Sequence, residues 1–411
     1  MRPLAFHADG IVPGDSPSFL DGAVVVDPLG RVLDVGPAAT ILPRHEGSRV
    51  VRVKGVIFPG LVNAHTHLEL SALRGRVPRG GGFARWAGAM FEERSGVGED
   101  ESASAVSLAL DELEDFATVA VGDVSNGLGT ALPLAGRGMA GTVFHEFFGM
   151  AREPLLARIA ELDSPSSPHL PHLRAFSSEL RYAPAPHTLH TTHPDGVRVL
   201  VARARALGVT TSLHLAEHDA ERRALEYGDG SMVSWLSLLS PAAARFPWPR
   251  TGPVVHARSL GLLAPDVLLV HLADARPEEL DMIASAGAKV ALCPRSNAWI
   301  SGLVPPLASM LESGIEPALG TDSLASSPSL DVLEEAHALA LAFPDLSCER
   351  LARMATWNGA LALDLPHLGR IAPGARPGLF ALEGGTPGSP AHALVHGRSL
   401  PRRPLVPRVT P

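Results

Sequence analysis

Between residues 58 and 367, short apolar segments typical of buried β-strands alternate with segments of helical periodicity. This alternation predicts a parallel sheet covered by helices, because parallel strands need long crossover connections. Eight such strands predict a (β/α)8 TIM-like barrel, with functional side chains after the strand C-termini. The expected strands are Leu61–His67, Thr118–Val124, Gly141–Phe148, Arg174–Leu180, Thr210–Leu215, Val267–Leu272, Lys289–Leu292 and Pro317–Leu319. The expected helices include Ala103–Phe116, Gly196–Leu207, Pro277–Ala286 and Leu330–Ala342.

The two ends of the chain have a different pattern. Residues 1–57 contain short apolar runs separated by turn signals such as Asp27-Pro28-Leu29-Gly30, and residues 368–411 return to short strands with many Gly and Pro. Neither end is long enough to bury a core alone. We therefore predict that 1–57 and 368–411 form one small β domain beside the barrel of residues 58–367.

Composition excludes several classes of function. A formal net charge of -8 argues against nucleic acid or an anionic membrane as the main partner. Two cysteines among 411 residues offer no disulfide framework. We find neither a signal peptide nor an apolar run of transmembrane length, which favours a cytoplasmic protein. A small-molecule substrate is the expected partner.

The most informative residues lie in the stretch FPGLVNAHTHLELSALRG, residues 58–75. His65 and His67 are two positions apart, so on an extended strand both imidazoles point to the same side. Two neutral imidazoles on one side suit a transition-metal ion. With 18 histidines in the chain, one such pair is expected by chance, so the pair alone is a weak signal.

Three later strands also end in titratable residues. His214 and Glu217 close the strand 210–215, His271 ends the strand 267–272, and Asp322 follows the strand 317–319. Burying an unpaired titratable group is costly, so each needs a partner. One such histidine is usually a satisfied core residue, but four strand ends in one barrel indicate a shared metal and proton-transfer site.

The chain resembles the amidohydrolase superfamily, in its deaminase and chlorohydrolase branch. The matching segments, in the order found in that family, are PGLVNAHTHLELSALRG with Phe83-Ala84-Arg85-Trp86, LHLAE at 213–217, His271, CPRSN at 293–297 and GTDSLASSPSLD at 320–331. The resemblance covers nearly the full length. It implies the (β/α)8 barrel and a small β-sandwich built from both termini.

The resemblance also implies a role for each titratable residue. The implied metal ligands are His65, His67, His214 and Asp322, with Glu217 as the proton shuttle, His271 as the residue that orients the attacking water, and Asp322 as a proton acceptor. One divalent ion per chain is expected, zinc in the first place, although the same donors accept iron. The reaction would be hydrolytic removal of ammonia from the ring carbon of a purine-like base or nucleoside.

The lysines and cysteines narrow the choice of metal centre. Lys54 and Lys289 are the only lysines, and neither lies on a middle strand, where binuclear relatives carry a bridging lysine. A mononuclear centre is therefore expected. Cys293 and Cys348 are isolated, which excludes the Pro-Cys-x-x-Cys deaminase architecture.

The expected substrate contacts depend on weaker signals. We predict that Glu69, Trp86 and Asn297 bind substrate, and HTHLELS resembles the corresponding stretch of aminodeoxyfutalosine deaminases, which makes aminodeoxyfutalosine the preferred substrate. The family's Pro-His-Ala-Pro-Tyr-like turn is altered here, so that Pro184 replaces its histidine and His187 its aromatic residue. By default, five further histidines are assigned to surface or core: His187, His190, His193, His218 and His256.

Alternative functions remain open at this point. The same metal site could release chloride or an alkylamine from a triazine, or hydrolyse guanine, a pyrimidine or a cyclic amide. A non-catalytic barrel scaffold is disfavoured because all six expected site positions are filled. Relatives often form homodimers, which the sequence alone does not test.

Overall fold

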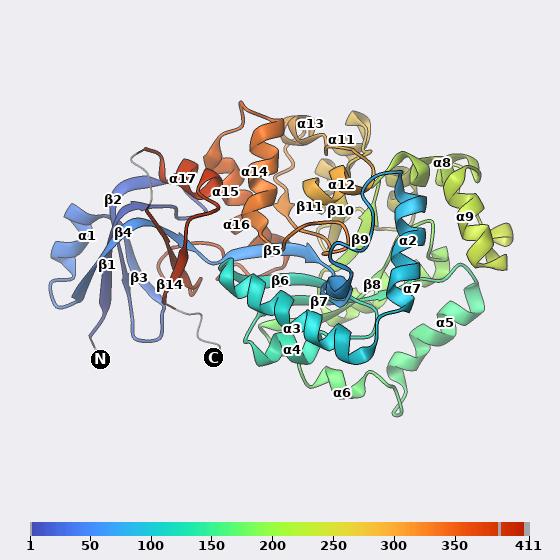
Figure 1. Cartoon of the computed structure of the whole chain (residues 1–411), viewed down its shortest axis with the longest axis horizontal. Coiled ribbons are helices and arrows are strands. Elements are labelled where there is room, and N and C mark those ends of the chain that lie inside the picture. The colour runs from blue at the N-terminus through green and yellow to red at the C-terminus, as the bar shows by residue number, and fades with distance from the viewer. Residues whose placement is uncertain (1, 385–387, 407–411) are drawn as a thin grey trace.

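The computed structural model describes residues 2–384 and 388–406, and its strands form two four-stranded parallel sheets and one six-stranded sheet (Figure 1). The first parallel sheet contains, in order, β5 (Leu61–Thr66), β6 (Thr118–Ser125), β7 (Ala140–Phe147) and β8 (Leu180–Pro186). The second contains β12 (Ala318–Leu319), β11 (Lys289–Leu292), β10 (Val267–His271) and β9 (Thr211–Leu215). The chain is therefore an α/β protein with parallel sheets, as predicted.

The two parallel sheets approach each other at both edges. At one junction, Thr66 at the end of β5 forms an isolated parallel bridge with Asp322, three residues beyond β12. At the other, the Thr211 hydroxyl of β9 donates to the backbone oxygen of Pro184 in β8 at 2.8 Å. The ends of β5 and β12 therefore lie side by side.

Helices connect most strands and cover the sheets (Figure 1). Four of them match expected segments: α3 (Glu99–Asp115), α7 (Pro194–Leu207), α11 (Pro277–Ala286) and α14 (Val332–Ala342). Five others border the site described below: α2 (Phe83–Ser95), α5 (Arg152–Ala160), α8 (Asp219–Tyr227), α9 (Ser231–Leu239) and α12 (Pro294–Ile300).

One expected strand is misplaced. The segment Arg174–Leu180 is mostly turn and loop, and β8 begins only at its last residue and continues to Pro186. Proline has no N–H to donate, so Pro184 and Pro186 are unfavourable residues for a strand that is paired on both sides. Among the described strands, β8 forms a regular ladder with β7 alone, so a missing N–H on its other side removes no ladder hydrogen bond.

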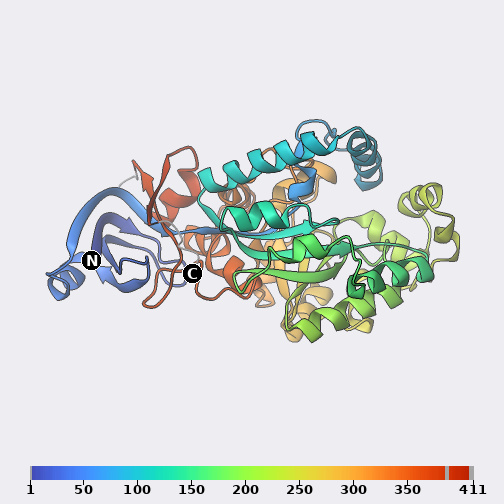
Figure 2. The ribbon, with the colours of Figure 1, turned by 90° about the horizontal axis from the view of Figure 1, so that it is seen from below.

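The ends of the chain share the six-stranded sheet. Its order is β14 (Arg402–Val406), β13 (Leu379–Glu383), β4 (Arg49–Pro59), β1 (Leu4–Ile11), β2 (Phe19–Val26) and β3 (Val32–Pro37). β13 pairs antiparallel with β4, so the C-terminal segment completes a sheet begun by the N-terminal one. Figure 2 shows the N-terminal strands, in dark blue, and the last described segments, in red, at the same end of the molecule.

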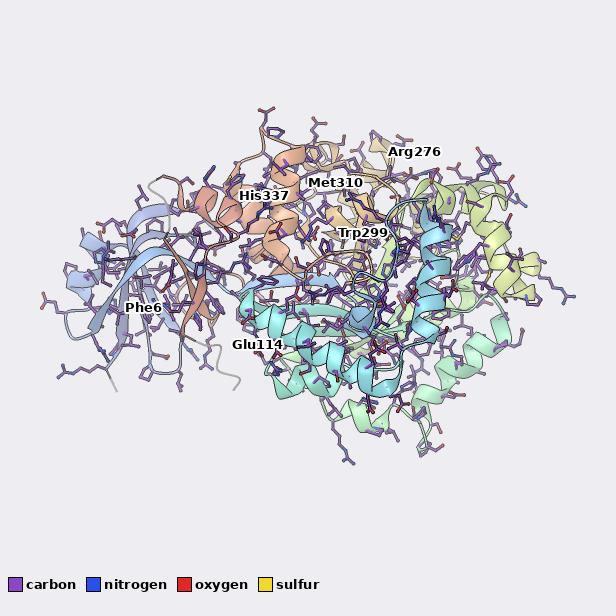
Figure 3. All side chains as sticks on the ribbon, viewed as in Figure 1. Phe6, Glu114, Arg276, Trp299, Met310 and His337 are labelled. Atoms are coloured by element: carbon purple, nitrogen blue, oxygen red, sulfur yellow. The ribbon has the colours of Figure 1, made fainter. Side chains whose placement is uncertain are left out.

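The six-stranded sheet and the parallel sheets have separate apolar cores. Phe6 packs in a cluster belonging to the six-stranded sheet, whereas Met310 packs in the large cluster around the second parallel sheet; Figure 3 labels both. Among the described helices, none is both long and apolar enough to cross a membrane. Cys293 and Cys348 are both free.

Candidate active site

Three histidines from two strands converge at one point. His65 lies in β5, His67 follows that strand, and His214 lies in β9. The ring centroid of His65 is 4.9 Å from that of His67 and 4.9 Å from that of His214. The Nε2 atoms of His67 and His214 are 3.1 Å apart. One ring nitrogen from each of the three residues lies within 4.8 Å of the other two.

The environment keeps these imidazoles neutral. Burial is the largest cause that lowers the pKa of His65 and His214, and it lowers the pKa of His67 to about 3. Neutral imidazole has a free lone pair, which is the form that binds a metal ion. All three rings are therefore available as ligands near neutral pH.

Asp322 joins the histidines from the second sheet. Its Oδ1 lies 3.5 Å from His67 Nε2 and 3.8 Å from His65 Nε2. Its Oδ2 accepts hydrogen bonds from Ser296 and, at 2.9 Å, from the Ser326 hydroxyl. Burial alone would raise the pKa of Asp322, but nearby His67, His271 and Ser296 lower it below its usual value. The carboxyl group is thus ionised, with one oxygen held by serines and the other facing the histidines.

The donor set fits a divalent metal ion. Both ring nitrogens of His65 are buried and have no hydrogen-bond partner among the described residues. Buried polar atoms without partners are costly, so their presence here indicates a ligand. His65, His67, His214 and Asp322 could hold the ion with three imidazoles and one carboxylate, a set that suits zinc or iron.

Glu217 and His271 lie beside this cluster. The ring centroid of His271 is 5.6 Å from that of His65, and its Nε2 lies 3.8 Å from Glu217 Oε1. Burial, followed by the charges of Asp322 and Glu221, raises the pKa of Glu217 well above its usual value. A carboxyl group that stays protonated near neutral pH can act as a general acid.

A cavity of about 510 Å³ opens from these residues. That volume is in the usual range for sites that enclose a small molecule. Its deep end contains His67, His214, His271, Glu217 and Asp322. Its outer walls are mostly apolar and aromatic, with Phe83, Trp86, Met90, Phe148, Met150 and Trp235. The cavity can therefore bury an apolar ring system against the polar cluster.

Two of the three expected substrate contacts line this cavity. Trp86 lies on α2, and its indole N–H donates to the Ala325 backbone oxygen at 3.3 Å. Glu69 also lines the cavity, but the end of β6 and the loop after it already bind both of its oxygens, through Ser125, Asn126, Gly127 and Gly129. Asn297 is fully buried outside the cavity lining, and its Nδ2 donates to His271 Nδ1 at 3.2 Å. The structure thus brings Asn297 to His271 and not to the substrate cavity.

The structure adds two residues that the sequence analysis did not select. His187 follows β8 directly and lines the cavity, with its ring centroid 5.1 Å from that of His214, so its default assignment to surface or core was wrong. The expected strand ended at Leu180, whereas β8 ends at Pro186, so the sequence did not place His187 directly after a strand. Glu146 in β7 also lines the cavity, and its Oε1 lies 3.5 Å from His214 Nδ1. A carboxylate near the end of an apolar strand is the signal that could have identified it.

Comparison with known proteins identifies the family. The sequence model of the amidohydrolase family matches residues 56–400, which is most of the chain and includes every residue of the cluster. The chain belongs to the amidohydrolase family. The resemblance predicted from the motifs is therefore confirmed.

Two curated relatives of this amidohydrolase are deaminases. A 5-methylthioadenosine/S-adenosylhomocysteine deaminase of Nitratidesulfovibrio vulgaris is 29% identical over 393 residues, covering 92% of this chain and 83% of the relative. An aminodeoxyfutalosine deaminase of Deinococcus radiodurans is 30% identical over 333 residues, covering 75% and 73% of the two chains. This amidohydrolase is accordingly a hydrolase that acts on carbon–nitrogen bonds.

A solved structure has the same fold. Helicobacter pylori aminofutalosine deaminase, in complex with methylthio-coformycin, superimposes with a TM-score of 0.85 at 22% identity, and the match covers 98% of each chain. At this identity the likeness concerns the fold, which extends over both the parallel sheets and the six-stranded sheet.

Proposed function

We propose that this amidohydrolase is a metal-dependent deaminase of 6-aminopurine nucleosides, with aminodeoxyfutalosine as its preferred substrate. The observation that carries the proposal is the position of Glu217, whose pKa burial raises, beside a cluster of three histidines and Asp322 that lines a cavity of about 510 Å³. The names of both curated relatives favour a nucleoside with an exocyclic amine.

In this proposal, His65, His67, His214 and Asp322 hold one divalent ion, preferably zinc. When bound, the ion supplies Lewis-acid activation of a water molecule near neutral pH. The fold around it would be a closed (β/α)8 barrel over residues 58–367, with a small β-sandwich from residues 1–57 and 368–411. The contacts at both junctions of the parallel sheets support that closure.

The residues of the chain would move the protons. Glu217 donates its proton to N1 of the purine, which makes C6 electrophilic, and Asp322 accepts a proton at Oδ1 from the attacking water. His271 Nε2, directed toward Glu217, orients that water. As the adduct collapses, Glu217 takes the proton of the new C6 hydroxyl and passes it to the departing amine, and the proton held by Asp322 then restores the protonated Glu217. Overall, one water is consumed, the C6–N6 bond breaks, and ammonia and the 6-oxopurine nucleoside leave.

The outer end of the cavity supports a substrate that carries a carboxylate. Arg158 of α5 lines this end, and its guanidinium lies 5.8 Å from the ring centroids of both Phe147 and Phe148. Its Nη1 donates to the Phe148 backbone oxygen at 3.0 Å, and Arg158 forms no ion pair with a carboxylate among the described residues. An unpaired guanidinium suits a bidentate carboxylate, and aminodeoxyfutalosine bears one on an aromatic ring.

The test is direct assay of deamination. The metal-loaded protein should convert aminodeoxyfutalosine with the ultraviolet shift from an adenine to a hypoxanthine chromophore and release an equal amount of ammonia. Adenosine, 5-methylthioadenosine and S-adenosylhomocysteine serve as comparison substrates. No shift with any of the four, together with turnover of guanine, a pyrimidine or a chlorotriazine, would overturn the proposed substrate class.

A further inference from the structure

The turn that carries Glu217 is held by the first turn of α8. His218 is the N-cap residue of this helix, and its Nδ1 accepts the backbone N–H of Glu221 at 3.0 Å. In return, Glu221 Oε2 accepts the backbone N–H of Glu217 at 2.9 Å. This reciprocal pair is similar to a capping box, but the N–H that the glutamate binds lies one residue before the N-cap. That N–H belongs to Glu217 itself.

The backbone at this turn needs such support. Ala216, directly before Glu217, has a φ of 48°, in the left-handed region that alanine rarely adopts. Residues persist in this region only where the surrounding contacts hold them. The hydrogen bond from Glu217 to Glu221 is one contact that fixes the peptide immediately after Ala216.

Neither capping residue lines the cavity. Glu221 and His218 are each 1% exposed, and both are absent from the residues around the cavity. His218 stacks on Phe83 with 4.2 Å between ring centroids. Phe83 is the first residue of α2 and does line the cavity. The pair therefore lies behind the cavity wall, between that wall and the backbone of Glu217.

We propose that Glu221 is a positioning residue for Glu217, anchored by His218. The inference rests on the proton-transfer role proposed for Glu217. Glu217 must reach both a ring nitrogen and the departing amine, so its side chain tolerates little displacement. Misplacement of a reacting group by about 1 Å can cost about 100-fold in rate. Loss of the bond from the Glu217 N–H to Glu221 would free the turn and move the carboxyl group.

Two substitutions at residue 221 separate the hydrogen bond from simple packing. Glu221→Leu keeps the volume but removes the acceptor, and should lower kcat about 10- to 100-fold with KM within about threefold of wild type. Glu221→Gln keeps an acceptor oxygen and should retain kcat within about threefold of wild type. Both variants should keep the wild-type metal content. The matched control is Glu226→Leu in the same helix, since Glu226 pairs with Arg222 and Arg276 and not with Glu217.

Should Glu221→Leu fail to fold, a pair at residue 218 tests the same arrangement. His218→Phe keeps an aromatic ring against Phe83 but removes the Nδ1 acceptor, so kcat should fall; His218→Asn supplies a side-chain acceptor at the N-cap and should retain it.

Three results would overturn the positioning role. The first is a wild-type kcat in Glu221→Leu. The second is an equal loss of kcat in Glu221→Leu and Glu221→Gln. The third is a loss of bound metal that parallels the loss of activity. Glu217→Gln distinguishes failure of this inference from failure of the proposed function. If Glu217→Gln is inactive while Glu221→Leu is fully active, only the positioning role fails. If Glu217→Gln remains active, the proposed proton shuttle itself is wrong.

Discussion

The Nδ1 atom of His214 lies 3.0 Å from the backbone carbonyl oxygen of His187. A carbonyl oxygen only accepts, so Nδ1 carries the proton of the neutral imidazole and Nε2 carries the lone pair. Nε2 is the atom that faces His67 at 3.1 Å. The residue after β8 therefore sets the tautomer of a histidine in β9, and turns its lone pair toward the cluster.

We expect the purified protein to bind close to one divalent metal ion per chain. His214→Ala should lose most of the metal because the cluster then has only two imidazoles and one carboxylate. Elemental analysis after dialysis measures this, with His193→Ala as a control, because His193 caps α7 and does not line the cavity. Two equally occupied, tightly bound ions per chain would contradict a mononuclear centre.

Glu217→Gln should keep the fold and the metal while lowering kcat about 10²- to 10⁴-fold, the usual contribution of general acid–base catalysis. Glutamine matches the size of the side chain but cannot donate and recover a proton. Steady-state assay of nucleoside deamination, with metal content measured on the same sample, checks the expectation. Turnover within threefold of wild type would remove Glu217 from the mechanism.

His271→Asn should also keep the metal and impair turnover. His271 lies beside the three-histidine group and is not part of the set whose nitrogens lie within 4.8 Å. Its Nδ1 already accepts from Asn297, which leaves Nε2 for the side facing Glu217. Metal loss equal to that of His214→Ala would show instead that His271 is a ligand.

Arg158→Gln should change substrate selectivity. A hydrogen bond to a charged group contributes about 1.5–3 kcal/mol, so KM for aminodeoxyfutalosine should rise about 10- to 100-fold. KM for 5-methylthioadenosine, which has no carboxylate, should stay within about threefold. Arg152→Gln is the matched control, because Arg152 lies on the same helix but pairs with Asp195. Equal effects on both substrates would contradict carboxylate recognition by Arg158.

Buried Glu335 predicts a pH-dependent loss of stability. Burial raises its pKa from 4.5 to about 8, so between these values the folded chain retains a proton that the unfolded chain has released. The free energy of unfolding should therefore fall as pH rises through this window, by up to about 1.4 kcal/mol per pH unit. Below pH 4.5 both states are protonated, and above pH 8 both are ionised, so the contribution is then constant.

The side chain of residue 335 cannot ionise in Glu335→Gln, so this variant should lose the part of the fall in unfolding free energy with pH that Glu335 contributes. Urea denaturation of the metal-loaded protein at several pH values between 5 and 9 measures it. Glu334→Gln, at the neighbouring position of α14, pairs at the surface with Arg398 and is the control. An unchanged slope in Glu335→Gln would show that Glu335 is ionised in the folded protein throughout the window.

The sequence alone determined the alternation of strands and helices and the positions of the titratable strand ends. The boundaries of β11 (Lys289–Leu292) and α11 agree with those expected, because apolar periodicity and proline at a helix start are local signals. The two-residue spacing of His65 and His67 determined that both rings share one side of the strand. These features depend on neighbouring residues along the chain, so they can be read without knowing the fold.

Only the tertiary structure decided which side chains meet. The prolines of β8 are compatible with a strand because β8 forms a regular ladder on one side only, with β7, and this strand brings His187 to its end beside His214. Glu146, Asn297 and the loop that binds Glu69 likewise acquire their contacts from segments distant in sequence. A hydrogen bond depends on the distance and direction between two groups in space. Local periodicity specifies neither quantity for residues that are far apart in the sequence and meet only because the sheets pack together.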